Sequence, residues 1–171
     1  MQTLEKLFQN WSDALWGPPL IILLLGTHIF LTIRLRFIQR YIGTAIKLSF
    51  SRAHEGEGDV SPFGALTTAL AATIGTGNIV GVATAVAAGG PGAVFWGWLT
   101  GVFGIATKYA EAGLSVKYRI TTKSGLMAGG PMYVLERGMK QRWLGVIFAA
   151  LMCVTALVIG NMVQANSIST M

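Results

Sequence analysis

Residues 71–81, AATIGTGNIVG, place three glycines, two threonines and an asparagine in the middle of an apolar stretch. Each glycine weakens a helix by about 1 kcal/mol relative to alanine. The threonine and asparagine side chains offer hydrogen bonds that compete with the backbone ladder. The composition therefore predicts a helix that is broken in the middle of this segment.

A break of this kind has a definite chemistry. The half-helix that ends near Ile74 would present carbonyl oxygens, which suit a cation. The half-helix that begins near Gly77 or Asn78 would present amide hydrogens and the positive end of its dipole, which suit a carboxylate. Within a membrane these groups each cost several kcal/mol unless something polar takes them up. One break could therefore hold a zwitterionic amino acid that travels with sodium.

Two other interpretations of the glycines compete. A nucleotide-binding fingerprint needs G-x-G-x-x-G after a strand, whereas the spacing here is one residue too long and no strand precedes it. The pairs at 77 and 81 and at 97 and 101 also fit close helix packing. Packing is the preferred interpretation for Gly97 and Gly101, but it does not explain Asn78.

Other polar residues lie near the ends of apolar runs. Asn161 and Gln164 are three apart and share a helix face, so Gln164 is a second candidate for substrate contact, with hydrogen bonding between helices as the alternative. Lys108 and Glu111 are also three apart, and we interpret them as a local ion pair, with a coupling role as the alternative.

The composition indicates a membrane protein. Of the 171 residues, 53% are hydrophobic and 12% are charged, against the usual quarter. Residues 14–33, 60–107 and 143–171 carry no charge, and each stretch can hold a span of about 20 residues. The net charge of +6 comes from basic blocks that flank apolar runs, which indicates a membrane rather than nucleic acid. Paired carboxylates, nucleophile–base pairs and metal clusters are lacking in the spans, so we do not expect an enzyme.

Hydropathy and turn residues divide the chain into eight segments. We expect an N-terminal segment at 1–16, a span at 17–35, an amphipathic helix on the membrane surface at 36–50, a loop at 51–62, a broken span at 63–88, a span at 93–118, a loop at 119–142 and a truncated span at 144–171. Eleven of the thirteen lysines and arginines lie in the two regions that join the first span to the second and the third to the fourth. The positive-inside rule therefore predicts cytoplasmic loops and an outside N-terminus in a plasma (inner) membrane.

Several motifs resemble one transporter family. The run from 64 to 98, GALTTALAATIGTGNIVGVATAVAAGGPGAVFWGW, is followed by KYAE, GGPMY and GNMVQANS, and together these resemble the alanine/glycine:cation symporter family over essentially the whole chain. The resemblance implies sodium-coupled uptake of alanine or glycine and an all-α, leucine-transporter-like fold of two inverted five-helix repeats. In that fold the span at 17–35 precedes the core, and the later three spans are the first three core helices. The chain would then be an N-terminal fragment whose partner is the missing C-terminal half.

The resemblance also implies a role for each residue near the break. The backbone amides of residues 75–77 and the Thr76 side chain would hold the carboxylate. Asn78 and the Thr73 carbonyl would bind one sodium ion, and the Ala71 and Ile74 carbonyls a second. The predicted substrate-binding residues are thus Gly75, Thr76, Gly77, Asn78 and Gln164, and the predicted cation-binding residues are Ala71, Thr73, Ile74 and Asn78.

The coupling ion is the only bound species expected besides the substrate and lipid. An alternative function is a non-transporting membrane subunit or small channel that assembles through its GxxxG helix faces. Sodium dependence separates the two, because a passive channel needs no coupling ion. The substrate could be alanine, glycine or D-alanine. The coupling ion could be a proton instead of sodium.

Overall fold

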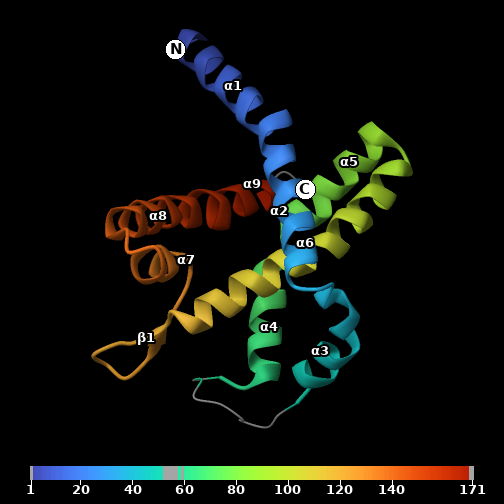
Figure 1. The fold of residues 1–171 in the computed structure, drawn as a ribbon. Coiled ribbons are helices and arrows are strands. Elements are labelled where there is room, and N and C mark those ends of the chain that lie inside the picture. The colour runs from blue at the N-terminus through green and yellow to red at the C-terminus, as the bar shows by residue number, and fades with distance from the viewer. Residues whose placement is uncertain (1, 52–57, 59, 170–171) are drawn as a thin grey trace.

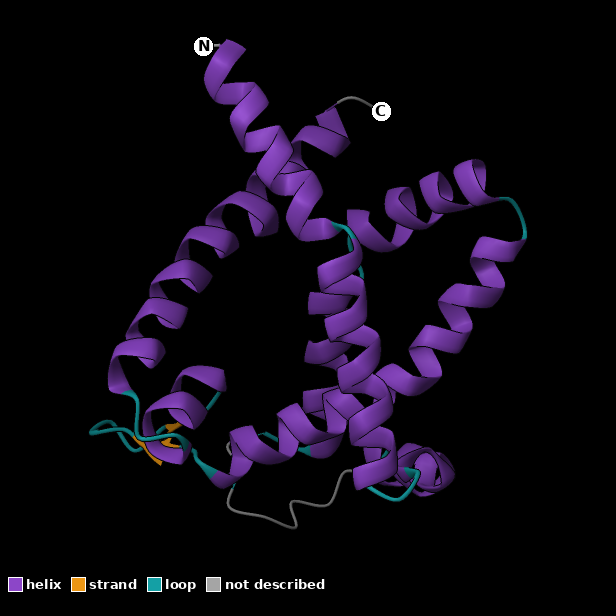
Figure 2. Cartoon of the chain, turned by 45° about the horizontal axis from the view of Figure 1, so that its top comes forward, coloured by secondary structure: helices purple, strands orange, loops and turns teal. Residues whose placement is uncertain are grey.

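The computed structural model describes residues 2–51, 58 and 60–169. This part of the chain is almost entirely helical, with one short antiparallel hairpin (Figures 1 and 2). The elements in chain order are α1 (Gln2–Trp16), α2 (Pro18–Arg34), the 3₁₀ helix η1 (Ile38–Tyr41), α3 (Ile42–Ser49), α4 (Pro62–Thr73), the π-helical turn η2 (Gly77–Gly81), α5 (Val82–Gly89), α6 (Gly92–Lys117), β1 (Ile120–Thr121), β2 (Met127–Ala128), α7 (Pro131–Tyr133), η3 (Val134–Gly138), α8 (Arg142–Thr155), η4 (Ala156–Met162) and α9 (Val163–Ser169).

Two helical stretches are long and apolar enough to cross a membrane, Leu4–Arg34 and Arg142–Ser167. A third candidate span consists of Pro62–Thr73 together with Gly77–Gly89, which meet at a bend of 63°. Helix α6 has 26 residues, but its composition is less apolar than that of these candidates. The chain is therefore a mostly helical membrane protein with two or three candidate spans. A crossing at 93–118 and a leucine-transporter-like arrangement stay predictions.

The described part of the chain has almost no buried core. Among the residues whose burial the structure describes, only Thr32, Ala106 and Gly145 are buried, and large apolar side chains are exposed along α1, α2, α6 and α8. The helices accordingly spread apart and meet at a few points (Figure 1). In a membrane protein, apolar faces of this kind are covered by lipid or by neighbouring helices.

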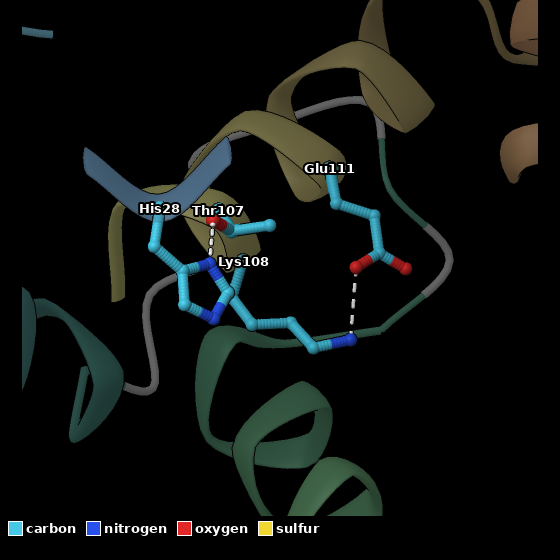
Figure 3. Close-up of polar contacts among 4 residues, drawn as sticks. All are labelled: His28, Thr107, Lys108 and Glu111. Atoms are coloured by element: carbon cyan, nitrogen blue, oxygen red, sulfur yellow. Dashed lines mark hydrogen bonds and ion pairs between the residues drawn. The ribbon is translucent and has the colours of Figure 1, made fainter. Parts of the chain in front are cut away.

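The best-packed of these points is the crossing of α2 and α6. His28 Nδ1 and Thr107 Oγ1 are hydrogen-bonded at 2.6 Å (Figure 3). Gln39 Nε2, just beyond α2, donates to Thr32 Oγ1 and to the Val102 carbonyl oxygen, each at 3.1 Å. These contacts surround the buried Thr32 and fix α2 across the middle of α6.

The crossing point does not use the two α6 glycines that were predicted to pack against another helix. No described side chain and no described atom of another segment lies within 4 Å of a Cβ built at Gly97 or Gly101, so these two residues make no close helix contact within the described chain. The glycine that faces α2 is Gly104, whose Cβ would lie 3.8 Å from His28 Nε2. The contacts of α2 and Gln39 with α6 are at Val102, Gly104 and Thr107, near the middle of α6.

The His28–Thr107 hydrogen bond should stabilise the α2–α6 pair modestly. Hydrogen bonds between membrane helices contribute about 0.6 kcal/mol on average and at most about 1.7 kcal/mol. We therefore expect a coupling energy in this range from a double-mutant cycle of His28→Ala and Thr107→Ala, measured by unfolding in mixed micelles. Strictly additive effects would show that the bond contributes nothing to stability.

A joint of glycines connects α6, α7 and α8. A Cβ on Gly129 would lie 2.8 Å from the Ser115 carbonyl oxygen of α6, and a Cβ on Gly145 would lie 2.8 Å from the Met132 carbonyl oxygen of α7. Both obstacles are backbone atoms, which cannot rotate away. We call Gly129 and Gly145 with these two partners the glycine joint. The joint lies where the long helix from α8 to α9 packs against α7.

Candidate functional site

The helix is interrupted at residues 74–76, between α4 and η2. Helix α4 begins at a Ser61 cap, where the side-chain oxygen accepts the Gly64 amide at 3.1 Å, and Pro62 suits its first turn. Its last backbone bond is from the Ile74 amide to the Leu70 carbonyl, after which Ile74 is extended. The ladder restarts when the Gly75 carbonyl accepts the amides of residues 78 and 79, at 3.0 and 3.3 Å.

The interruption leaves two sets of backbone groups outside the helical ladder. The carbonyls of residues 71–73 lie past the last bond of α4, and the amides of Thr76 and Gly77 come before the first bond of η2. Helix ends characteristically leave such groups to other partners. Carbonyl oxygens at the end of one half and amide hydrogens at the start of the other are therefore held a few residues apart.

Asn78 joins the two halves of the broken helix. Its Nδ2 donates to the Thr73 carbonyl oxygen at 2.8 Å, across the interruption. Thr73 Oγ1 in turn donates to the Ala69 carbonyl oxygen at 2.7 Å, so its hydroxyl is directed back along α4. The side chain of Asn78 and the carbonyl of Thr73, which the resemblance assigned to one sodium ion, are thus in direct contact.

A small cavity lies where the break meets α9. Its volume is about 250 Å³, and it is lined by Ile74, Gly75, Thr76, Ile79 and Val80 from the broken helix and by Gln164 and Ser167 from α9. A Cβ on Gly75 would lie 3.2 Å from Gln164 Nε2, so the Gln164 amide fills the space beside this glycine. Gly75, Thr76, Gln164 and Ser167 are half-buried, although most of their neighbours are exposed. Two polar segments far apart in sequence therefore form one site.

The structure sorts the predicted residues into two groups. Ile74, Gly75, Thr76 and Gln164 line the cavity, whereas Ala71, Thr73, Gly77 and Asn78 lie beside it on the broken helix. Ser167 also lines the cavity but was not predicted as a site residue. It lies three positions after Gln164 and hence on the same helix face, which is the signal that could have identified it.

The lining of the cavity is mostly apolar, and it carries no charge. Its polar side chains are those of Thr76, Gln164 and Ser167, and the other lining residues are glycine or aliphatic. The charges of a bound zwitterion would therefore have to be met by neutral dipoles, backbone groups and the coupling ion. The ion pair between Lys108 Nζ and Glu111 Oε2, at 2.8 Å on α6, is close to His28 and does not line this cavity (Figure 3).

The chain is similar to proteins of one transporter family. The sequence profile of the sodium:alanine symporter family matches residues 1–171. A protein of Methanococcus maripaludis named sodium/alanine symporter AgcS is 57% identical over 171 residues, which cover 96% of this chain and 38% of the relative. An uncharacterized transporter of Haemophilus influenzae is 56% identical over 169 residues, 98% of this chain and 37% of the relative.

A more distant relative has a different substrate in its name. The probable sodium/glutamine symporter GlnT of Bacillus subtilis is 39% identical over 170 residues, which cover 98% of this chain and 35% of the relative. The chain thus spans less than two-fifths of the length of each of these relatives.

Proposed function

The chain belongs to the sodium:alanine symporter family, and from this premise we propose that it forms part of a secondary transporter that couples sodium entry to the uptake of alanine or glycine by alternating access. The family consists of transporters, so the chain is not an enzyme.

The observation that supports this function best is the meeting of the helix break with Gln164. The cavity of about 250 Å³ brings the half-buried Gly75, Thr76 and Gln164 together from two segments that are far apart in sequence. Its lining combines neutral polar groups with the aliphatic side chains of Ile74, Ile79 and Val80. That combination suits an amino acid with a short apolar side chain.

Within this proposal each half of the break has its own ligand. The amides of residues 75–77 and the Thr76 hydroxyl hold the substrate carboxylate at the positive end of the second half-helix. Asn78 and the Thr73 carbonyl bind one sodium ion, and the carbonyls of Ala71 and Ile74 bind another. Asn78 would turn its amide oxygen toward the ion, giving up its bond to Thr73. Gln164 closes the cavity from α9.

The membrane arrangement is proposed on the same basis. The N-terminus lies outside, 36–50 lies on the cytoplasmic surface and α6 crosses the membrane as the second core helix of a leucine-transporter-like fold. The relatives are more than twice as long as the chain, so we propose that further helices of the transporter complete both the cavity and the sodium sites.

Uptake of labelled alanine tests the function. It would be measured with sodium and with choline, in cells that lack their own alanine transporters. The proteins compared are the 171-residue chain, the M. maripaludis relative, and a chimera in which this chain replaces the matching portion of that relative. We expect sodium-dependent uptake by the relative and the chimera and none by the chain alone.

Other outcomes of the uptake experiment would count against the proposal. A folded chimera without sodium-dependent uptake would exclude this chain as part of an alanine symporter. Uptake that is equal in sodium and choline would favour a passive channel.

Replacing Gly75 with alanine should weaken substrate binding. The added Cβ would approach Gln164 Nε2 to 3.2 Å, so the flexible Gln164 side chain has to move away from the break. We expect the KM for alanine in the chimera to rise about ten-fold, equivalent to about 1.4 kcal/mol. Gly81→Ala is the matched control, because no described side chain and no described atom of another segment lies within 4 Å of its Cβ position. Equal KM values for the two variants would contradict the assignment of Gln164.

A further inference from the structure

Helix α1, for which the proposed transport function gives no role, has a continuous apolar face. Leu4, Leu7, Phe8, Trp11 and Leu15 recur at helical spacing, and each is more than half exposed. The opposite face is polar, and Gln9 Nε2 donates to Asp13 Oδ1 at 3.2 Å along it. No described segment covers the apolar face, since α1 projects away from the other helices (Figures 1 and 2).

Helices α1 and α2 together are too long to cross a bilayer as one straight span. The stretch Leu4–Arg34 has 31 residues, which at about 1.5 Å each is about 46 Å. The hydrocarbon core is about 30 Å thick, and a straight rod of this length would fit inside it only at a tilt of about 50°, beyond the usual range of roughly 0–40°. Glu5, Lys6 and Asp13 on α1 also disfavour the hydrocarbon interior. Helix α2 alone, with 17 residues, can reach across most of the core.

The junction between α1 and α2 is built to change direction. Gly17 separates the two helices, and Pro18 and Pro19 follow it. A proline has no amide hydrogen, so the carbonyl of Ala14 lacks its normal helical donor at Pro18. The ladder of α2 restarts with the Ile21 amide and the Gly17 carbonyl at 3.3 Å. The backbone at this point can bend at low cost.

We propose that α1 lies on the membrane surface, with its apolar face inserted at the boundary between lipid headgroups and acyl chains. The partner is the bilayer itself. Helix α1 is covalently joined to α2, so if α2 crosses the membrane the C-terminal end of α1 lies at the membrane interface. Trp11 lies in the apolar face, and tryptophan favours this depth. The charges of α1 are two acidic and one basic, so the apolar face rather than attraction to anionic lipid drives insertion, and zwitterionic lipid suffices.

Site-directed spin labelling tests this placement without relying on transport. Single cysteines would replace Leu7 and Trp11 on the apolar face, and Lys6 and Asn10 on the polar face, in the full chain carrying Cys153→Ala. The labelled chains would be reconstituted in phosphatidylcholine vesicles, and collisions with oxygen and with a nickel chelate would be measured. We expect a several-fold higher oxygen-to-nickel ratio at 7 and 11 than at 6 and 10.

The other outcomes overturn the proposal. High nickel accessibility at all four positions would mean that α1 extends into water. A high oxygen ratio at all four would mean that α1 enters the bilayer core. Exclusion of both reagents at 7 and 11 would mean that protein, such as a second copy of the chain, covers the face. Because each variant keeps at least four of the five apolar residues, loss of one apolar side chain does not decide the result.

Discussion

Replacing Asn78 with alanine should abolish sodium-dependent alanine uptake in the chimera at ordinary sodium concentrations. The substitution removes the side chain that contacts the Thr73 carbonyl across the break and, in the proposed function, an oxygen ligand of one sodium ion. A polar contact to a charged group is worth about 1.5–3 kcal/mol. The affinity for sodium should therefore fall by about one to two orders of magnitude.

The sodium dependence of uptake distinguishes a lost ligand from a disrupted helix. If Asn78 is a ligand, raising sodium should restore part of the uptake, because weak binding is overcome by concentration. If its only role is to hold the two half-helices together, added sodium should restore nothing. Asn161→Ala is the matched control, since it removes the same exposed amide from η4, outside the cavity. Normal uptake by the Asn78 variant at low sodium would contradict the sodium-site assignment.

The helix break could be predicted from sequence because its signals are local. Gly75, Gly77 and Asn78 weaken the helix through their own backbone and side-chain preferences, and these act within a few residues. The structure interrupts the helix at 74–76, in the middle of the segment that carries these residues. Local preferences are sufficient to predict a feature, such as this break, that does not depend on contacts with distant residues.

The contact between Gly75 and Gln164 could not be derived in the same way. Each residue was a candidate by itself, and only the family resemblance connected them. Helical periodicity gives the face on which Gln164 lies but not which distant helix that face meets. Ser167 was missed for the same reason, although its spacing from Gln164 places it on that face.

Glycines show this limit most clearly. The spacing of Gly97 and Gly101 predicts a close helix contact, and the described chain does not form it. A Cβ added at Gly129 or at Gly145, neither of which was predicted to pack, would lie 2.8 Å from a backbone oxygen of another segment. A glycine that packs against another segment cannot be told from one that does not by its local sequence. The difference is which segment lies against it, and that depends on the directions of whole helices.

Replacing Gly145 with alanine should destabilise the chain more than alanine at any exposed glycine of the same helix. Gly145 is buried, and the new Cβ would lie 2.8 Å from the Met132 carbonyl oxygen and 3.6 Å from the Glu136 Cβ. Overpacking of this kind costs about 1–3 kcal/mol, because the backbone has to shift. In a chain of this size each kcal/mol lowers Tm by about 2–4 °C. Gly160→Ala is the control, because no described side chain and no described atom of another segment lies within 4 Å of its Cβ position.

The same substitution should act at a distance on the cavity. Helices α8, η4 and α9 form one stretch, Arg142–Ser167, that is attached to the rest of the described chain at the glycine joint and carries Gln164 near its other end. A small change of direction at Gly145 therefore becomes a larger displacement at Gln164. We expect Gly145→Ala to lower Tm in detergent, measured by fluorescence-detected size exclusion after heating, and to raise the KM for alanine in the chimera. An unchanged Tm and KM would show that the joint tolerates a methyl group and does not set the direction of this helix.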